Sequence, residues 1–282
     1  MAVRRIAAVN DLSGFGRCSL TVSIPILSAM GFQVCPVPTA VLSAHTGYPD
    51  PVIRDFTNDM EGFLRHWESL GLTFACGYTG YLGNEKQADV LEPFLRRLRE
   101  QGALRLVDPA MADHGKLYAS CTPGLVQAMS RLVALANVAT PNLTELCLLT
   151  GGEYAAVCGA ADYREQVERM ARQLLDSGCG AVVVTGVESG DIIENCVLAA
   201  VDAAPVWVSG HRVDRHFAGT GDLFASVLCG WLLRGLDLAE AARKTVEFVC
   251  KTTAATAQWQ ENGQDGIAFE PFLGELSEEE VV

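Results

Sequence analysis

The strongest chemical signal in the sequence is the turn Gly219-Thr220-Gly221-Asp222, which leads into an apolar helical pattern. Glycines let a backbone turn sharply and approach a ligand closely, and the free amides and dipole at a helix start attract an anion. Because a carboxylate repels phosphate, we interpret Asp222 as a base that takes the proton of an attacking hydroxyl while the adjacent amides hold the transferring phosphoryl group. An aspartate at a helix start is also an ordinary stabilising feature, and the tetrapeptide alone leaves both interpretations open.

Further polar residues stand where other predicted strands end. Asp108 closes the fourth strand, Asp113 comes shortly after it, and Asn142 and Glu145 follow the fifth. Oxygen ligands such as these suit Mg²⁺, which binds through one or two carboxylates plus phosphate. The spacing of Asn142 and Glu145 also fits a helix cap and capping box, and both roles can hold together. The chain has no GxxxxGK(S/T) motif, so it is not a P-loop enzyme.

The segment 10–19, after the first predicted strand, begins like a dinucleotide-binding fingerprint. Ser19 stands where the third glycine belongs, and no acidic residue lies about 20 residues further on to hold a ribose. We therefore expect a substrate-facing loop, because Asp11 and Ser13 are polar groups at the edge of the sheet where ligands bind.

The elements that would position these residues alternate between apolar, β-rich runs and helical patterns, which predicts βαβ units and a mostly parallel sheet with helices on both faces. The predicted strands are Arg5–Asn10, Gln33–Leu42, Thr73–Tyr78, Leu104–Asp108, Val138–Thr140, Ala181–Thr185, Ile192–Ala200 and Val206–Val208. The predicted helices are Ser19–Met30, Thr57–Leu70, Asn84–Gln101, Pro123–Ala136, Asn142–Thr150, Asp162–Ser177, Asp222–Arg234 and Asp237–Trp259. The last two strands have no helix between them, which predicts a small antiparallel edge. We expect one domain over residues 1–282, with a frayed acidic tail over 274–282.

Bulk composition limits the classes of function. The 282 residues carry a formal net charge of −13, which argues against nucleic-acid and anionic-membrane partners because both need a basic face. The start of the chain lacks the apolar stretch of a signal peptide, and no run approaches the ~20 residues that span a bilayer. Ten scattered cysteines without a CxxC pair predict reduced thiols, no zinc site and a cytoplasmic location. The histidines for which the sequence indicates no partner are His66, His114, His211 and His216.

Five segments carry a resemblance to a known family: Leu42–Tyr48, Gly80–Gly83, Asp108–Met111, Thr140–Glu145 and Gly219–Asp222. In this order, they make the chain resemble the ribokinase-like superfamily, and within it the pyridoxal/pyridoxamine (vitamin B6) kinases, over essentially its whole length. The Gly-Thr-Gly-Asp turn is the superfamily's anion-hole signature. The segments Ser43–Tyr48 and Gly80–Gly83 are more specific to B6 kinases.

The resemblance implies a ribokinase-like three-layer αβα sandwich that uses ATP and Mg²⁺ to phosphorylate the 5′-hydroxymethyl group of pyridoxal, pyridoxine or pyridoxamine. It leaves a requirement for a monovalent cation such as K⁺ open, and it implies a homodimer. Asp222 matches the catalytic base, and Gly219, Thr220 and Gly221 match the anion hole. The substrate pocket is expected to include Asp11, Ser13, His45, Thr46, Gly47 and Tyr81. The ATP site is expected to include Asp108, Asn142, Glu145, Thr185, Gly186, Gly219 and Thr220, and the metal residues are Asp113 and Glu145.

The chain departs from the B6 kinase pattern at three places. Asp11 stands where many pyridoxal kinases have serine, and a carboxylate there could pair with a cationic ring nitrogen or amine, which would favour pyridoxamine or pyridoxine over the aldehyde. Ala112 replaces the usual glycine before Asp113. No cysteine flanks Gly219–Asp222, so a lid cysteine that captures the aldehyde is not evident.

Three other functions compete with a B6 kinase. A hydroxymethylpyrimidine kinase of thiamin synthesis is the closest alternative, because it shares the fold, the chemistry and the anion hole. A sugar or nucleoside kinase of the superfamily is disfavoured, since the Gly-Gly ribose-site motif is absent after the first strand. A non-catalytic B6-binding or ATP-binding protein is disfavoured because Asp222 and its glycines are all present.

Overall fold

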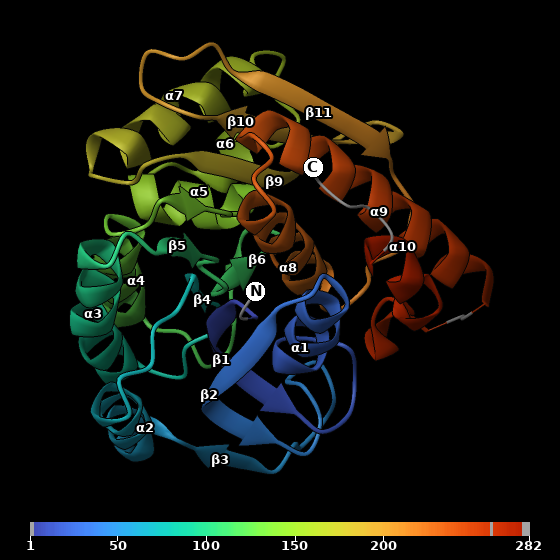
Figure 1. The fold of residues 1–282 in the computed structure, drawn as a ribbon. Helices are drawn as coiled ribbons and strands as arrows, with labels where there is room; N and C mark the ends of the chain where they lie inside the picture. Colours follow the sequence, from blue (N-terminus) through green and yellow to red (C-terminus); the bar gives the residue numbers. More distant parts are fainter. Residues whose placement is uncertain (1–2, 260–261, 278–282) are drawn as a thin grey trace.

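The computed structural model describes residues 3–259 and 262–277, and within them nine strands form one sheet in the order β11-β10-β9-β8-β5-β4-β1-β2-β3 (Figure 1). A separate two-stranded hairpin pairs β6 with β7. The strands are β1 (Arg5–Ser13), β2 (Gln33–Leu42), β3 (Ile53–Asp55), β4 (Cys76–Thr79), β5 (Leu104–Val107), β6 (Ala112–Asp113), β7 (Lys116–Leu117), β8 (Val138–Ala139), β9 (Val182–Ser189), β10 (Ile192–Leu198) and β11 (Val206–His211).

Helices connect most of the parallel strands. They are α1 (Leu20–Ala29), α2 (Thr57–Ser69), α3 (Glu85–Glu100), α4 (Pro123–Val133), α5 (Leu143–Thr150), α6 (Tyr154–Val157), α7 (Tyr163–Asp176), α8 (Thr220–Leu233), α9 (Leu238–Trp259) and α10 (Leu273–Ser277), with short 3₁₀ turns η1 (Gly263–Asp265) and η2 (Glu270–Phe272). None of the described helices is long and apolar enough to cross a bilayer.

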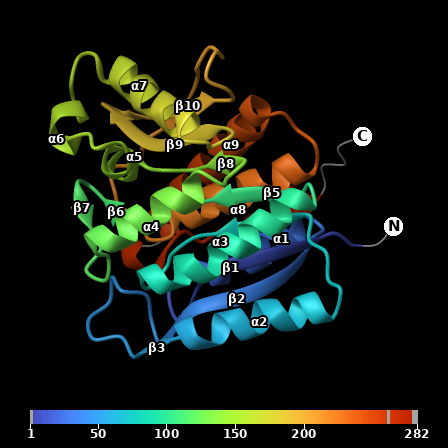
Figure 2. The same ribbon diagram turned by 90° about the vertical axis from the view of Figure 1, so that its left-hand side faces the viewer.

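Two hydrophobic cores lie on opposite faces of the sheet. Ala7 and Val9 of β1 belong to the core formed with α2, α3, α4, α5 and α7, whereas Ile6 belongs to the core formed with α1, α8, α9 and α10. Successive residues of a strand point to opposite faces, so one strand supplies both cores. Figures 1 and 2 show a helical layer on each side of the sheet. The predicted three-layer αβα sandwich is therefore confirmed.

The antiparallel part of the sheet is larger than predicted. The predicted edge is present, since β10 pairs antiparallel with both β9 and β11. The opposite edge carries β3, which pairs antiparallel with β2 and was not predicted. All three residues of β3 are exposed, so they lack the buried-exposed alternation that identifies a strand in sequence. The β6–β7 hairpin was missed because each of its strands has only two residues.

Part of the predicted frayed tail is ordered. Residues Leu273–Ser277 form α10, in which Leu276 is 2 % exposed and belongs to the core beside α1 and α8. Lys251 Nζ donates to the Glu275 carboxylate at 2.8 Å. The prediction of a frayed tail did not consider that Leu276, in an otherwise acidic segment, can pack into the core. Residues 278–282 of the predicted tail lie outside the described part of the chain.

Candidate active site

The buried side-chain amide of Asn10 connects the carboxyl ends of β1 and β4 to the start of α8. Asn10, which is 1 % exposed, donates from Nδ2 to Asp222 Oδ1 at 3.0 Å. Its Oδ1 accepts the backbone N–H of Asp11 at 3.0 Å and that of Tyr81 at 2.8 Å. An ideal Cβ at Gly80 would lie 2.3 Å from Asn10 Nδ2, so glycine there leaves room for the amide. Because two N–H groups hold its oxygen, Asn10 presents its NH₂ group to Asp222.

The surroundings of Asp222 raise its pKa to about 6. The largest cause is burial, which disfavours the charged carboxylate, and the negative charge of Asp11 acts in the same direction. Hydrogen bonds from the Ser19 backbone and from Asn10 oppose them by stabilising the ionised form. A general base works best when its pKa lies near the working pH. Asp222 therefore has the electrostatics that the sequence-based assignment requires.

The turn before Asp222 needs glycine at its first position. Gly219 has a φ of 71° at the N-terminus of α8, and an ideal Cβ there would lie 2.0 Å from the carbonyl oxygen of Arg17. Thr220 Oγ1 donates to the Phe217 carbonyl at 2.9 Å and holds the turn closed. The first amides of a helix have no partner within the helix. Here these amides belong to Thr220, Gly221 and Asp222, so the predicted anion site lies directly beside the carboxylate.

Asp11 and Ser13 lie beneath the surface and not on an open face. Asp11 is 6 % exposed, and its two carboxylate oxygens accept the hydroxyl protons of Ser13, at 2.9 Å, and of Ser19. Burial raises the pKa of Asp11, and the two serine hydroxyls oppose that effect. This arrangement argues against direct pairing of Asp11 with a substrate cation. Its charge acts instead on Asp222, because Asp11 raises the pKa of that carboxyl.

Asn142 and Glu145 form the predicted capping box at the start of α5. Asn142 Oδ1 accepts the Glu145 N–H, and Glu145 Oε2 accepts the Asn142 N–H, both at 2.9 Å. Glu145 Oε1 also accepts the Met111 N–H at 3.1 Å, and the residue is 2 % exposed. Each Glu145 oxygen already accepts a backbone N–H and the side chain is buried, which favours contact with a metal through water over direct coordination.

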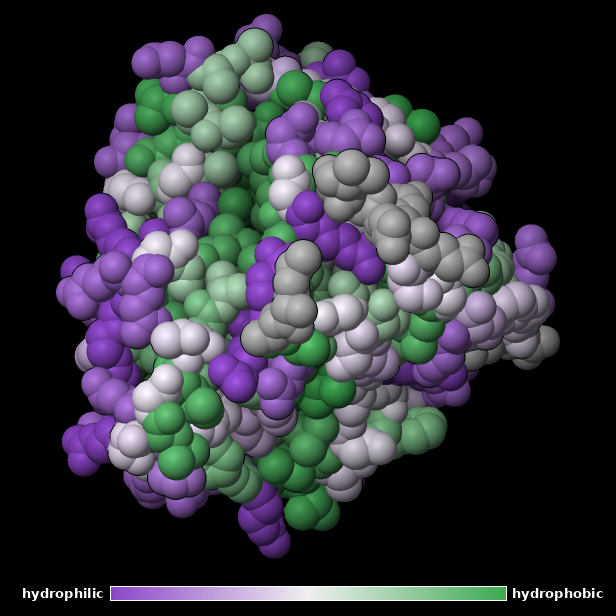
Figure 3. Space-filling view, viewed as in Figure 1, coloured by the Kyte–Doolittle hydropathy of each residue, from purple (hydrophilic) through white to green (hydrophobic). Residues whose placement is uncertain are grey.

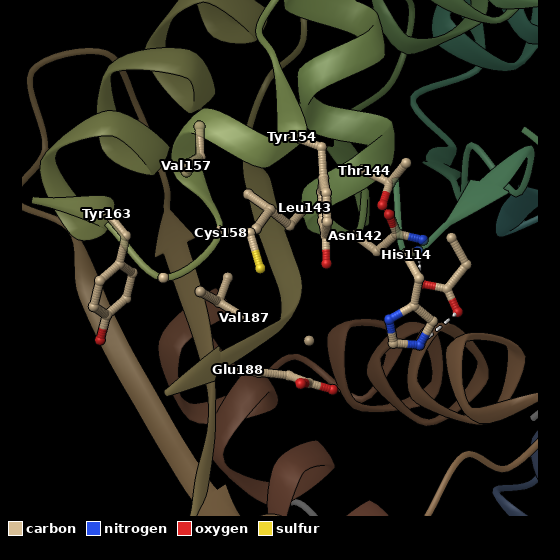
Figure 4. A pocket seen from close by; sticks show the side chains of 13 residues that line it. His114, Asn142, Leu143, Thr144, Tyr154, Val157, Cys158, Tyr163, Val187 and Glu188 are labelled. Carbon is tan, nitrogen blue, oxygen red and sulfur yellow. Dashed lines mark hydrogen bonds and ion pairs between the residues drawn. The ribbon is translucent and has the colours of Figure 1, made fainter. Parts of the chain in front are cut away.

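Several residues predicted for the nucleotide site share one cavity. Asp113, Asn142 and Gly186 line it together with Thr144 and Glu188. Figure 4 shows His114, Asn142 and Thr144 together on one side of this cavity, with Cys158 and Tyr163 farther along it. Thr185 pairs with Asn142 in a parallel bridge, which joins the middle of β9 to the start of α5.

Asp108 lies deeper than this cavity wall. It is 6 % exposed, and its pKa is raised by burial first and by the charge of Asp222 second. The negative charge of Asp222 makes the ionised form of Asp108 less favourable, so the two carboxyl groups influence each other electrostatically.

The segment 45–48 is fastened to the C-terminal turn η1. His45 Nε2 lies 2.7 Å from the Gln264 carbonyl oxygen, and His45 Nδ1 lies 3.1 Å from the Gly47 N–H. Since Nδ1 accepts a hydrogen bond from the Gly47 N–H, Nε2 must carry the ring proton and donate a hydrogen bond to the Gln264 carbonyl. Tyr48 Oη also donates to Asp265 Oδ1. We call residues 45–48 with 264–265 the C-terminal clasp. In it, His45 offers a substrate its ring carbons and not a free nitrogen.

Tyr81 and Thr46 complete the predicted substrate residues. Tyr81 Oη donates to Ser120 Oγ at 2.8 Å, and its backbone is fixed by Asn10. Thr46 is exposed on the segment that contains His45. The structure therefore places Tyr81 beside Asn10, which contacts Asp222, whereas Thr46 lies in the clasp.

Comparison with known proteins identifies the family. Residues 71–266, more than half of the chain, match the family model described as phosphomethylpyrimidine kinase. The chain belongs to the phosphomethylpyrimidine kinase family. A relative from Bordetella avium, named pyridoxine/pyridoxal/pyridoxamine kinase, is 35 % identical over 266 residues, which cover 89 % of this chain and 85 % of the relative.

Two solved structures agree with this kinase fold. A Bacteroides thetaiotaomicron protein named as a phosphomethylpyrimidine kinase, in a crystal form with pyridoxal, matches with a TM-score of 0.92 and 37 % identity over 98 % of this chain and 96 % of that one. Pyridoxal kinase from Lactobacillus plantarum matches with a TM-score of 0.87 and 29 % identity over 98 % of this chain and 97 % of that one. The resemblance to pyridoxal kinases is confirmed, and the chain is a kinase.

Sequence reasoning missed three residues that hold the kinase site together. Asn10 orients Asp222, Ser19 binds both Asp11 and Asp222, and Gln264 closes the clasp on His45. A buried asparagine at a strand end was the only local signal for Asn10. Ser19 has a φ of 52°, a conformation uncommon for a residue with a side chain, which the sequence does not reveal.

Proposed function

We propose that this kinase transfers the γ-phosphoryl group of ATP to the 5′-hydroxymethyl group of a vitamin B6 vitamer, with Asp222 as the general base. The observation that carries the proposal is the partly buried Asp222 carboxylate, with a pKa raised to about 6, beside the first amides of helix α8 in the Gly219–Asp222 turn. The names of the Bordetella and Lactobacillus relatives support the vitamer as acceptor.

The residues divide the reaction between a base and an anion site. Asp222 takes the proton of the hydroxymethyl group while the hydroxymethyl oxygen forms a bond to the γ-phosphorus. The bond between that phosphorus and the β-γ bridging oxygen breaks at the same time and releases ADP. The Thr220 and Gly221 amides stabilise the negative charge on the phosphoryl oxygens. Asn10 keeps the carboxylate oriented through the 3.0 Å hydrogen bond to Oδ1. The proton on Asp222 is later released to solvent.

Mg²⁺ fits the oxygen donors at the ATP end of this site. Asp113, with a side chain 35 % exposed, offers a carboxylate on the wall of the cavity that Asn142 and Gly186 also line. Glu145 would act through water, since its oxygens bind backbone amides and Mg²⁺ usually keeps several waters. When bound, Mg²⁺ neutralises charge on the phosphates of ATP.

Substitution of the base tests the mechanism. Asp222→Asn keeps the shape of the side chain but removes the proton acceptor, so kcat should fall by about 10²–10⁴-fold. Asp237→Asn is the matched control, because Asp237 is also an aspartate at a helix start, where it accepts the Glu240 N–H. Full turnover by a folded Asp222→Asn protein would refute the assignment.

A hydroxymethylpyrimidine kinase is the second candidate, and the description of the matching family model favours it. Kinetic constants for pyridoxal, pyridoxine, pyridoxamine and hydroxymethylpyrimidine, each with Mg·ATP, decide between the two. The B6 proposal requires the highest kcat/KM with one of the three vitamers. The same assay with K⁺ replaced by Na⁺ tests a monovalent-cation requirement, and sedimentation of the full chain tests the homodimer that the family resemblance implies.

A further inference from the structure

Two histidines that the sequence left without partners converge on Asp113. His114 Nε2 lies 3.6 Å from Asp113 Oδ2, and His216 Nδ1 lies 4.0 Å from the same oxygen. All three candidate ligand atoms lie within 4.8 Å of one another. The two imidazole rings stand edge to face, with centroids 5.7 Å apart. We call Asp113, His114 and His216 the histidine cluster.

The histidine cluster joins two loops that are each anchored by the backbone. His114 occupies the β6–β7 turn with a φ of 46°, which is uncommon for a residue with a side chain. The next amide, Gly115 N, donates to Thr144 Oγ1 at 2.9 Å and fixes this turn against α5. His216 precedes the anion site, and an ideal Cβ at Gly263 would lie 1.9 Å from its carbonyl oxygen, so that backbone is closely packed. The loops are held in place, while both imidazoles remain exposed.

The atoms of the cluster are disposed for metal coordination. Asp113 Oδ1 accepts the His114 N–H at 2.8 Å, which leaves Oδ2 directed toward both rings. Zinc takes nitrogen and carboxylate ligands at about 2.0–2.2 Å, so tetrahedral ligands stand about 3.4 Å apart. The separations of 3.6 and 4.0 Å need only small side-chain rotations to reach that value. Nearby Glu188 already forms an ion pair with Arg212 at 3.1 Å.

We propose that Asp113, His114 and His216 form a binding site for a divalent transition-metal ion of the zinc class, with water completing its coordination. Imidazole nitrogens select zinc, copper, nickel or cobalt over Mg²⁺, which prefers oxygen ligands. The ion would link the β6–β7 turn to the loop that enters the anion site. This site shares Asp113 with the proposed Mg·ATP region but adds two imidazole ligands, and metal binding in the absence of nucleotide tests it without the kinase reaction.

Cobalt titration of the untagged full chain, without nucleotide or Mg²⁺, tests the site. Co²⁺ is a visible-absorbing substitute for zinc, and competition by Zn²⁺ then reports the zinc affinity. We expect one Co²⁺ per chain with the absorption of nitrogen and oxygen ligands. His114→Asn and His216→Asn should each weaken binding by more than the roughly 10–100-fold that loss of an outer-shell partner causes. Asparagine also suits the left-handed conformation at position 114.

Matched controls separate the cluster from other ligands of the chain. His66→Gln and His211→Gln change exposed histidines outside the cluster and should leave Co²⁺ binding unchanged. Cys158→Ser tests the exposed thiol on the same cavity, whose Co²⁺ complex would show sulfur charge-transfer absorption. Unchanged binding by a folded His114→Asn/His216→Asn double variant would overturn the proposal, as would loss of binding in Cys158→Ser alone. Kinase activity enters none of these readouts, so a failed metal site and a failed kinase assignment are distinguishable.

Discussion

Asn10→Asp and Asp11→Asn, which exchange an amide and a carboxylate, should shift the pKa of Asp222 in opposite directions. Asn10 stabilises the Asp222 carboxylate by a hydrogen bond, whereas Asp11 destabilises it by its charge. Asn10→Asp replaces the donor by a second carboxylate but keeps the oxygen that accepts the Asp11 and Tyr81 amides. Asp11→Asn removes the repelling charge and keeps the side-chain shape. Neither change alters the size of the buried group.

The expected shifts follow from the contacts of Asp222. A hydrogen bond to a charged group contributes about 1.5–3 kcal/mol, and one pKa unit corresponds to about 1.4 kcal/mol. Asn10→Asp should therefore raise the pKa of Asp222 from about 6 by about one unit or more. Asp11→Asn should lower it by up to about one unit, because burial, the largest cause of the raised pKa, remains.

The pH dependence of kcat/KM measures this titration in the free enzyme. The same vitamer is used for the unmodified chain and for every variant, so ionisation of the substrate affects all pH profiles equally. The acid limb near pH 6 in the unmodified chain should move upward in Asn10→Asp and downward in Asp11→Asn. Asp89→Asn serves as the control, since Asp89 is an exposed carboxylate on α3 that pairs with Arg131.

The signs of the two shifts decide the outcome. If both variants shift the acid limb in the same direction, the opposing roles of Asn10 and Asp11 are wrong. If neither shifts it while Asp222→Asn abolishes turnover, the limb reports another group, and Asp108 is the nearest candidate because its pKa is also raised by burial and by Asp222.

Three further predictions concern the stability and shape of the site. Gly219→Ala should lower kcat by at least about 10²-fold and lower the melting temperature, because a Cβ would meet the Arg17 carbonyl at 2.0 Å; an unchanged kcat would contradict this. The raised pKa of Asp222 means that its contribution to stability is present below about pH 4 and is lost as the pH rises through about 6. Asp222→Asn should therefore gain up to about 3 kcal/mol over the unmodified chain at pH 8 and little at pH 4, and urea unfolding at both pH values checks this difference. His45→Ala should open the C-terminal clasp and raise the KM for the vitamer about 10-fold with little change in the KM for ATP. Equal changes in the two KM values would show that the clasp does not act specifically on binding of the vitamer.

The amino-acid sequence predicted the alternation of strands and helices that the structure has, and it led to the proposal that Asp222 is the base. Continuous apolar strands between helical patterns require a parallel sheet buried on both faces, and the structure has one. Gly219–Asp222 was identifiable because its chemistry is local: a glycine that permits a φ of 71°, free amides and a carboxylate lie within four residues. The capping box of Asn142 and Glu145 was identifiable for the same reason, since its two partners are three residues apart.

Only the tertiary structure decided which distant residues act on these local motifs. Asn10 lies 212 positions from Asp222, and His45 lies 219 positions from Gln264. No periodicity or spacing encodes such pairs, because folding brings a strand or loop from the start of the chain against a helix or turn near its end. The folded structure also buries Asp11, which the sequence predicted as a substrate residue, and there its charge raises the pKa of Asp222. A sequence states which groups are available, but burial and proximity, which set their pKa values and partners, exist only once the chain has folded.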